Sequence, residues 1–578
     1  MKVNLVNSNI KKDYVWTLLK ERGIDKVDEF YNPDSKALEN PYNLLNIEKG
    51  IELYESVVFN KDSKILLIID SDLDGYTSAA IIYLYTKNLN PKANIDYVIH
   101  KGKEHGLRDL MNKIKDFNFD YNLIIAPDSS TNDYEYIEQL KEYNLPVLIL
   151  DHHILEEDTK ISDNCVLINN QISTNYNNKS LSGAGVTFQF CRALDIKNNT
   201  NYAKNYVDLA AVGVIGDVMS GLEIENQYLW KLGLNNINNL FLKELINKQD
   251  YSMGGKINPT TIAFYIVPLV NAIIRVGTQE EKDRMFQAFI DGDKLVPSNK
   301  RGSKGNLEKV AIESVRECVN AKNKQDKMLE KAMEQMEIKI FNYDLLENKI
   351  IIIKLDEEDT FPPELNGLLA MRICAKYKRP TIVGRLNNEG YIRGSMRDSS
   401  NSPIKSFKDF LMDSGYFEYV LGHSKAAGIS FKKKDLEKIY EYANDKLKDV
   451  KIEEKCFDVN FERAAAEKDI EDIIEDVNKY EDIWSQNCSE PLIYIHDINL
   501  NKDDIVIMGK NKDTIKFTKF DITYIKFKAK EFIENLEQFN KEIKIEIVGR
   551  CKVNEWMGHY TNQIIIDAYE ITDGTLSF

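Results

Sequence analysis

The chain has 578 residues, of which 43% are hydrophobic and 10% aromatic, and its formal net charge is −16. This length exceeds what one hydrophobic core supports, so about three or four domains are expected, and the hydrophobic content excludes a disordered protein. The acidic charge argues against a protein that coats nucleic acid without specificity, because such proteins carry a basic footprint. A nuclease is compatible with it, since metal ions offset clustered acids and a local basic channel can hold a strand.

The seven cysteines are dispersed and form no Cys-x-x-Cys pair, which indicates neither a zinc site nor a disulfide framework. We interpret them as reduced thiols. The N-terminus lacks the apolar stretch of a signal peptide, and no run approaches the roughly 20 apolar residues that span a bilayer. The sequence therefore predicts a cytoplasmic protein without a membrane partner.

Residues 1–60 combine helical patterns with a Pro/Asn-rich stretch, and we expect them to form an N-terminal cap. In residues 61–300 strand and helix signals alternate, which is typical of a doubly wound α/β domain with a parallel sheet. Apolar runs of strand length indicate the buried strands of that sheet. These runs are 64–69, 123–126 and 145–150.

Acidic or histidine-containing strings follow each of these apolar runs. They are Asp70-Ser-Asp72-Leu-Asp74-Gly75, Asp128 and Asp151-His152-His153, and Asp217 follows in a later apolar segment. The carboxyl ends of parallel strands meet at one edge of a sheet, so we expect these side chains to converge. Like charges a few ångströms apart cannot all stay ionised, and metal cations relieve that repulsion. The pattern therefore indicates a two-metal phosphoesterase centre.

Two other interpretations fit part of this pattern. The string from Asp70 to Gly75 matches the opening of an EF-hand loop, but the twelfth position of such a loop needs Glu, and here it is Ile81. An apolar strand also precedes the string where an EF-hand has a helix. A haloacid-dehalogenase-type nucleophile at a strand end is the second alternative, and it leaves the Asp-His-His string unexplained.

Small residues and one buried cation follow in the same domain. The glycines of Leu181-Ser-Gly-Ala-Gly-Val186 are expected to let a helix approach the sheet closely. Asn271 and Arg275 lie one helical turn apart in an apolar segment, on one face. Because a buried arginine without a partner is costly, we expect Arg275 to meet a carboxylate or a phosphate.

A long charged helix is predicted over residues 301–340, as a connection between two domains. Residues 341–450 then predict a second, smaller α/β domain. It contains Arg393-Gly-Ser395-Met-Arg397 after one strand and Gly422-His423-Ser-Lys-Ala-Ala-Gly428 before another. Hydroxyl and guanidinium groups next to glycine are suited to holding a phosphate.

Residues 451–578 show period-two alternation, which predicts a small antiparallel barrel. Its strands are expected at 514–520, 523–527, 541–548 and 563–568. Lys516, Lys519, Lys526 and Lys528 place basic charge beside Phe and Tyr. This combination suits a groove for single-stranded nucleic acid, where bases stack on aromatic rings and lysines follow the backbone.

The order of these motifs resembles that of the RecJ-type single-strand-specific exonucleases of the DHH phosphoesterase superfamily, nearly from end to end. The residues that carry the resemblance are Asp70–Gly75, Asp128, Asp151–His153, Leu181–Val186, Ala210–Asp217 with Glu225 and Asn226, Pro268–Ala272 with Arg275, Arg393–Ser395 with Arg397, and Leu421–Gly428. The resemblance implies a DHH domain, a connecting helix, a DHHA1 domain and a C-terminal OB-fold.

The resemblance also implies a function, which is 5′-to-3′ hydrolysis of single-stranded DNA in repair and recombination by a monomer. Two divalent ions are expected, Mn²⁺ first and Mg²⁺ as the alternative, and a single-strand-binding protein or a helicase as a partner. One ion would bind Asp72 and Asp128, and the other Asp74, Asp128, His152 and Asp217. Asp70 is a ligand or an orienting residue. Asp151 orients the histidine pair, and His153 contacts the scissile phosphate. The 5′-phosphate and substrate would be held by Arg275, Arg393, Ser395, Arg397, His423 and Asn271.

The chain departs from the family pattern at three places. His100-Lys-Gly-Lys-Glu-His-Gly-Leu107 stands where the family has an Arg and a Gly-Tyr-Gly string, so His100, Lys101 or Lys103 is expected to contact the strand end instead. Phe361-Pro-Pro-Glu-Leu-Asn-Gly367 replaces a Trp-His-x-Gly-Val string, and Asp128-Ser-Ser replaces Asp-x-Gly. None of these changes removes a proposed metal ligand.

Two rival functions belong to other classes. A phosphodiesterase of short oligonucleotides or cyclic dinucleotides would share the DHH and DHHA1 parts, and the N-terminal cap and the C-terminal barrel disfavour it. A catalytically silent replication scaffold would keep the fold and lose ligands, whereas here the ligand set is complete.

Overall fold

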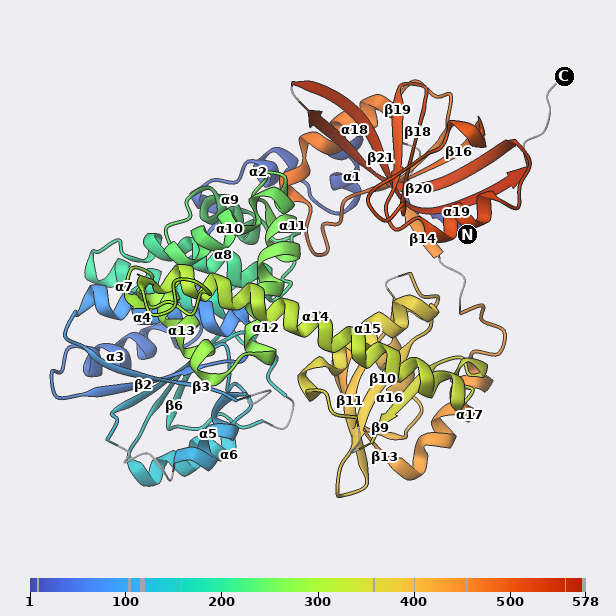
Figure 1. Ribbon diagram of the computed structural model, residues 1–578. Coiled ribbons are helices and arrows are strands. Elements are labelled where there is room, and N and C mark those ends of the chain that lie inside the picture. Colours follow the sequence, from blue (N-terminus) through green and yellow to red (C-terminus); the bar gives the residue numbers. More distant parts are fainter. Residues whose placement is uncertain are drawn as a thin grey trace. The chain divides into compact units, whose positions relative to one another are not determined.

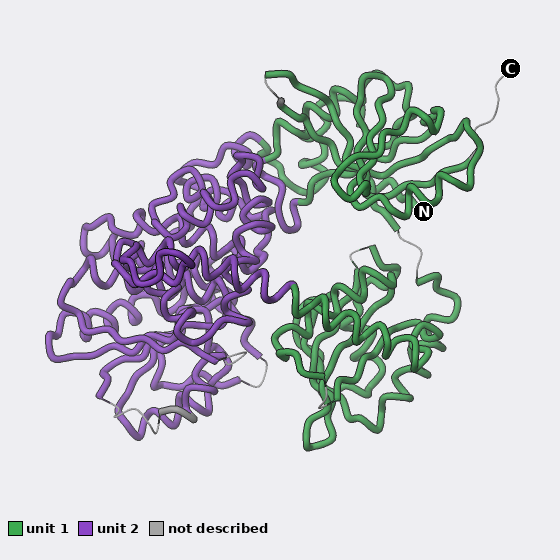
Figure 2. The backbone as a smooth tube through the Cα atoms, in the orientation of Figure 1, with its two compact units in different colours: residues 1–27, 327–481, 489–578 green, residues 28–326, 482–488 purple. Residues whose placement is uncertain are grey.

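The computed structural model describes residues 1–7, 10–101, 105–114, 120–156, 159–356, 359–399, 401–452, 456–556 and 558–573 (Figure 1). The chain divides into two compact units (Figure 2). Unit 2 comprises residues 28–326 with 482–488, and unit 1 comprises 1–27, 327–481 and 489–578. The first 27 residues thus belong to the unit that also contains the C-terminus.

Unit 2 is built on a five-stranded sheet of order β3-β2-β4-β5-β6, in which all pairs are parallel. The strands are β2 (Lys64–Ile69), β3 (Asn94–Ile99), β4 (Leu123–Pro127), β5 (Val147–Asp151) and β6 (Cys165–Asn169). From β2 the chain first adds β3 on one side and then β4, β5 and β6 on the other. The strand order therefore reverses between β2 and β4, and such a switch point is where open α/β sheets bind ligands.

Helices cover both faces of this sheet (Figure 1). On one face α5 (Gly106–Ile114) and α6 (Tyr134–Leu140) bury Leu107, Leu110, Ile137 and Leu140 against apolar side chains of the strands. On the other face lie α3 (Ile47–Val58), α4 (Leu73–Leu89) and α7 (Gly183–Asn198). The predicted doubly wound α/β domain is confirmed.

The rest of unit 2 is helical, apart from a short hairpin. Its helices include α8 (Val207–Gly216), α9 (Ile224–Asn235), α10 (Leu240–Met253), α12 (Val267–Val276) and α13 (Gln279–Ile290). The hairpin pairs β7 (Leu295–Pro297) with β8 (Leu307–Lys309). Helix α14 (Val310–Asn342) follows directly, so the long helix expected over 301–340 begins after the hairpin.

One helical stretch, Pro259–Val276, is long and apolar enough to cross a membrane by length and composition alone. It is an exception to the absence of long apolar runs expected from the sequence. Half of the stretch is buried inside the fold. A single segment of this kind is weak evidence for a membrane span, because the core helices of many proteins meet the same criterion.

Residues 351–432 of unit 1 form a five-stranded mixed sheet of order β12-β13-β11-β10-β9. The strands are β9 (Ile351–Leu355), β10 (Thr381–Leu386), β11 (Tyr391–Arg397), β12 (Phe417–His423) and β13 (Ala426–Lys432). Only β9 and β10 pair in parallel. Helices α15 (Asn366–Tyr377), α16 (Phe407–Met412) and α17 (Leu436–Lys446) accompany the sheet, as expected for a smaller α/β domain.

The C-terminal part of unit 1 contains a seven-stranded sheet of order β15-β16-β20-β21-β19-β18-β17. The strands are β15 (Phe461–Ala464), β16 (Leu492–Asn501), β17 (Val506–Met508), β18 (Thr514–Lys519), β19 (Ile522–Lys526), β20 (Glu542–Trp556) and β21 (His559–Asp573). The pairs β15/β16 and β19/β21 are parallel and the other pairs antiparallel. Near the N-terminus, β1 (Lys2–Leu5) pairs with β14 (Cys456–Val459).

Candidate metal centre

The acidic strings converge because three parallel strands end at the same edge of the sheet. Asp70 follows β2, Asp128 follows β4, and Asp151 is the last residue of β5. In the register of β4 and β5, Pro127 lies opposite Leu150, and the Asp128 amide donates to the Leu150 carbonyl at 2.9 Å. The side chains therefore meet at the switch point between β2 and β4.

Three overlapping groups of carboxylates and imidazoles have ligand atoms within 4.8 Å of one another. Every one of the six predicted metal ligands belongs to at least one group, and Asp128 and His152 each belong to two. The groups are Asp70, Asp72 and Asp128; Asp74, His152 and Asp217; and Asp128, Asp151, His152 and His153.

The string from Asp70 to Gly75 joins a strand to a helix. Asp72 is the N-cap of α4, and its side chain accepts a hydrogen bond from the Gly75 amide at 3.0 Å. Because strand β2, and not a helix, comes directly before the string, this loop is not an EF-hand. The turn instead places the three aspartates around the amino end of α4, at the edge of the sheet.

The glycine-containing string at the start of α7 holds a carboxylate. Asp74 accepts hydrogen bonds from Ser182 Oγ at 2.8 Å and from the amides of Gly183 at 2.7 Å and Ala184 at 3.1 Å. A Cβ on Gly183 would lie 2.5 Å from Oδ1 of Asp128. The expected close approach of a helix to the sheet is thus found at Gly183, where a larger residue would displace Asp128.

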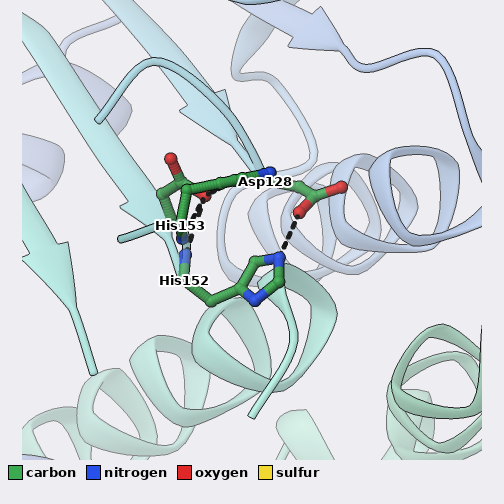
Figure 3. Close-up of side chains that lie close together, drawn as sticks. Asp128, His152 and His153 are labelled. Atoms are coloured by element: carbon green, nitrogen blue, oxygen red, sulfur yellow. Dashed lines mark hydrogen bonds and ion pairs between the residues drawn. The ribbon is translucent and has the colours of Figure 1, made fainter. Parts of the chain in front are cut away.

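The two histidines of the Asp-His-His string have different partners. His152 Nε2 lies 3.3 Å from Asp128 Oδ1 (Figure 3), and it also lies 3.3 Å from Asp217 Oδ2. His153 Nδ1 lies 2.7 Å from Asp151 Oδ1. Asp151 is fully buried and also accepts from the Thr131 hydroxyl at 2.6 Å. Asp151 is therefore well placed to orient the ring of His153.

The electrostatics of the centre favour a bound cation. Burial, and then the charge of Asp74, raise the pKa of Asp128 and of Asp217 well above the usual range. Burial and the charge of Asp72 raise the pKa of Asp74 to about 6. These carboxyl groups are costly to ionise together without a positive charge between them.

The donor atoms fit a divalent cation. Oδ1 of Asp128 is buried and accepts no hydrogen bond from the residues that the structure describes. Burial, and then the charge of His153, lower the pKa of His152 to about 4, so its ring stays neutral and can donate a lone pair. Carboxylate oxygens with one imidazole suit Mn²⁺ or Mg²⁺.

Arg275 on α12 lies within the electrostatic influence of this acidic centre. Burial lowers the pKa of Arg275, and the charge of Asp72 acts in the opposite direction. The carboxylate or phosphate predicted as the partner of Arg275 stays a prediction, which the charge of Asp72 supports. Asn271 lies one turn earlier, and its Oδ1 is buried without a hydrogen bond from the described residues.

In unit 1, the side chains of β11 point alternately to the two faces of the sheet. Ile392 and Met396 lie in the hydrophobic core, so Arg393, Ser395 and Arg397 point to the opposite face. A Cβ on Gly367 of α15 would lie 2.5 Å from Arg397 Nη2. The absence of a side chain at Gly367 thus leaves room for Arg397. This glycine ends the string 361–367, which departs from the family pattern.

His423 ends β12 and is exposed, at the hairpin that leads into β13. In the strand register His423 lies opposite Ala426, and Ala426 lies opposite Arg397. His423 and Arg397 therefore share one face, with one strand between them and roughly 10 Å of separation. Arg393 is mostly exposed and lies 3.7 Å from Glu389. The structure thus places these groups on one face of the sheet, with Ser395 buried and with Arg393 and His423 exposed.

The expected strand-end contacts follow β3. His100 is buried, Lys101 is exposed, and Lys103 lies outside the described residues. The sequence prediction missed His105, whose Nδ1 lies 2.7 Å from Asp70 Oδ1. A signal for it existed, because the chain has only seven histidines and His105 lies in the string that departs from the family pattern.

Comparisons with known proteins identify the family that the order of the sequence motifs resembles. A family model described as "DHH family, N-terminal domain" matches residues 64–214, and one described as "RecJ OB domain" matches residues 466–568. The SPbeta prophage-derived protein YorK of Bacillus subtilis (strain 168), named as a single-strand DNA-specific exonuclease, is 37% identical over 99% of this chain and 98% of its own.

More distant relatives share the architecture. The single-stranded-DNA-specific exonuclease RecJ of Bacillus subtilis (strain 168) is 24% identical over 97% of this chain and 68% of its own length. The crystal structure of RecJ in complex with Mn²⁺ from Thermus thermophilus has a TM-score of 0.73, covering 98% of this chain and 79% of that one at 18% identity. At this identity the structural likeness establishes the fold.

Proposed function

This chain belongs to the RecJ-type family of single-strand DNA-specific exonucleases, and we propose that it hydrolyses single-stranded DNA from the 5′ end. The observation that carries the proposal is the convergence of six buried or half-buried ligands at the switch point of the sheet. A silent scaffold would not need such a costly cluster. The described ligand set has lost none of its members.

We assign the two metal positions to the overlapping groups. Asp70, Asp72 and Asp128 surround one position, and Asp74, His152 and Asp217 surround the other, next to Asp128. Mn²⁺ is the first candidate and Mg²⁺ the second. When bound, two such ions activate water and neutralise the charge of the phosphate.

The protein residues have separate tasks in this reaction. Asp128 lies between the two groups and fixes their spacing. The buried Asp151 raises the pKa of His153 to about 10, so that this ring carries both hydrogens and donates to a phosphate oxygen. Asp74 is held by the amino end of α7, which keeps the carboxylates in place before substrate arrives.

The direction of cleavage rests on the arginines. The 5′ end of a DNA strand carries a phosphate with two negative charges. This phosphate suits the guanidinium of Arg397 and the hydroxyl of Ser395, which lie on one face of β11. Arg275 and Asn271 on α12, Arg393 and His423 are the other proposed contacts. These assignments support hydrolysis in the 5′-to-3′ direction.

The C-terminal sheet favours a long strand over a dinucleotide as substrate. Lys519 lies over the ring of the half-exposed Phe520, and Phe527 and Tyr560 are 58% and 70% exposed. Exposed rings next to lysines suit the stacking of successive bases. We further propose that the enzyme works as a monomer in the cytoplasm, in repair and recombination, where a helicase or a single-strand-binding protein supplies the strand.

One assay tests the proposal. Single-stranded DNA labelled at either end, duplex DNA, RNA and a dinucleotide are incubated with the protein and Mn²⁺, and the products are resolved over time. We expect mononucleotides released from the 5′ end of single-stranded DNA. Cleavage of the dinucleotide alone would favour the small-nucleotide phosphodiesterase, and no metal-dependent cleavage would favour the scaffold.

A further inference from the structure

His105 places a second Asp–His pair at the centre. It lies directly before α5, and its Nδ1 is 2.7 Å from Oδ1 of Asp70. The side chain of Asp70 is 7% exposed and that of His105 is 50% exposed. A buried carboxylate therefore fixes one nitrogen of the ring, and the other nitrogen, Nε2, lies across the ring from it.

The backbone next to His105 is held by the loop that follows β4. The Leu107 amide donates to Ser130 Oγ at 3.0 Å and to Asp133 Oδ2 at 2.8 Å. Gly106 has a φ of +60°, and a Cβ there would lie 2.4 Å from Asp133 Oδ2. The same loop begins with the central aspartate of the metal centre. The ring is thus positioned by the element that also carries a proposed ligand.

The pair repeats the geometry of the Asp151–His153 pair. His153 Nδ1 lies 2.7 Å from Asp151 Oδ1, and its side chain is 44% exposed. The ring centroids of His105 and His153 are 5.4 Å apart, at an interplanar angle of 70°. Asp70 and Asp151 end strands on either side of β4, and Asp128 lies between them. Two half-exposed imidazoles therefore lie next to each other, and each is held by a buried carboxylate.

We infer that His105 is a further catalytic residue, which together with His153 binds the non-bridging oxygens of the phosphate at the centre. The identity of that phosphate rests on the proposed function. A ring between a carboxylate and a phosphodiester has an acceptor on each side, and with Nδ1 held by Asp70 the nitrogen left for the phosphate is Nε2. Neither histidine forms a covalent bond with the strand. Asp70 acts through His105 as a positioning residue.

The consequence is a pair of hydrogen-bond donors aimed at the place where negative charge grows during hydrolysis. Preorganised donors of this kind act more strongly in the transition state than in the ground state. The effect of losing one is therefore expected in kcat more than in KM, because the rest of the strand supplies the binding.

The first test compares His105→Ala and His105→Gln with Arg108→Ala, a matched control at an exposed position of α5. On 5′-phosphorylated single-stranded DNA with saturating Mn²⁺, we expect His105→Ala to lower kcat about 10- to 100-fold. His105→Gln keeps a donor near the position of Nε2 and should recover part of that loss. Arg108→Ala should stay within about twofold of the wild type.

The second test needs no turnover. Mn²⁺ affinity and the affinity for thymidine 5′-monophosphate, in the presence of Mn²⁺, are measured by calorimetry on the same variants. We expect His105→Ala to bind the nucleotide at least about tenfold more weakly, with Mn²⁺ affinity unchanged. The unfolding temperature of each variant shows whether it is folded.

The outcomes separate this inference from the proposed function. Wild-type kcat and nucleotide affinity in His105→Ala would overturn the inference while DNA hydrolysis stands. Loss of Mn²⁺ affinity would also overturn it, because His105 would then support the metal site, directly or through Asp70, rather than the phosphate. If the wild type binds the nucleotide through His105 but degrades no single-stranded DNA, the inference stands and the proposed function fails.

Discussion

The carboxylate centre of unit 2 and the arginine face of unit 1 are built in opposite ways. In the centre, ligands from several strands and helices are buried, and backbone amides fix them in one arrangement. On β11, alternation along one strand presents Arg393, Ser395 and Arg397, and Arg393 is 52% exposed. The centre is preorganised for its ions, whereas the proposed phosphate contacts on β11 include an exposed arginine that no buried partner fixes.

The largest effect is expected at the shared carboxylate of the centre. Asp128→Asn should lower kcat/KM on single-stranded DNA by a factor of about 10³ or more, which corresponds to about 4 kcal/mol of transition-state stabilisation. Asp128 is the aspartate common to two of the ligand groups. The ion-free variant should unfold at the same temperature as the wild type or higher, because a repulsive charge is gone. Near-normal turnover would contradict the two-metal assignment.

The next effect tests the preorganisation of the centre. Gly183→Ala places a Cβ 2.5 Å from Oδ1 of Asp128 and should displace that carboxylate. We expect a loss of about 100-fold in kcat, as a misplacement near 1 Å can cause, together with weaker Mn²⁺ binding. Gly292→Ala is the control, since its added Cβ comes no closer than 3.1 Å to a neighbour. Equal behaviour of the two variants would show that the close approach is unimportant.

A smaller and more selective effect is expected on the arginine face. Arg397→Ala should reduce the preference for 5′-phosphorylated over 5′-hydroxyl strands about 10- to 100-fold, since it removes a hydrogen bond to a charged group. Mn²⁺ affinity should not change, because no proposed ligand is touched. Arg393→Ala should have a weaker effect, as its side chain is exposed. Digestion from the 3′ end, or an unchanged end preference, would contradict this assignment.

The smallest effect concerns stability. Without ions, the folded protein holds protons on carboxyl groups such as that of Asp74, whose pKa is raised to about 6. A raised carboxyl pKa contributes stability that is complete below the unfolded value near 4 and is lost as the pH rises through 6. The ion-free protein should therefore unfold at lower temperature at pH 8 than at pH 5.

Bound Mn²⁺ should reverse this pH dependence of the unfolding temperature, because it replaces the protons on the carboxyl groups. Saturating Mn²⁺ should raise the unfolding temperature by several degrees at pH 8 and by less at pH 5, with about 2.7 kcal/mol gained at 100 times the dissociation constant. Scanning calorimetry with and without a chelator measures both values. An equal shift at the two pH values would mean that the carboxylates do not bind the ion.

The centre could be predicted because topology forces it. Apolar strands that each end in Asp or His predict convergence at one edge of a parallel sheet, and the ligand atoms of Asp70, Asp128 and His152 do meet there. For Gly183, the sequence predicted only that a helix approaches the sheet closely. That its amide holds Asp74 depends on the exact start of α7, which the sequence does not specify.

His105 escaped prediction for a physical reason. It follows β3, the edge strand, and reaches Asp70 only because Gly106 adopts a left-handed φ and the loop after β4 holds the next amide. A turn of this kind is not visible in hydrophobic periodicity. The mixed pairing of the C-terminal sheet was missed similarly, since alternation within one strand does not reveal the direction of its neighbour.

The measurement that tests the central claim most directly is anomalous diffraction from crystals of the full chain grown with Mn²⁺. We predict two manganese peaks about 3.5–4 Å apart, both within bonding distance of Asp128, with His152 and Asp217 on one of them. The Asp128→Asn variant should lose at least one peak. A single peak, or manganese away from the carboxylates after β2 and β4, would contradict a two-metal centre.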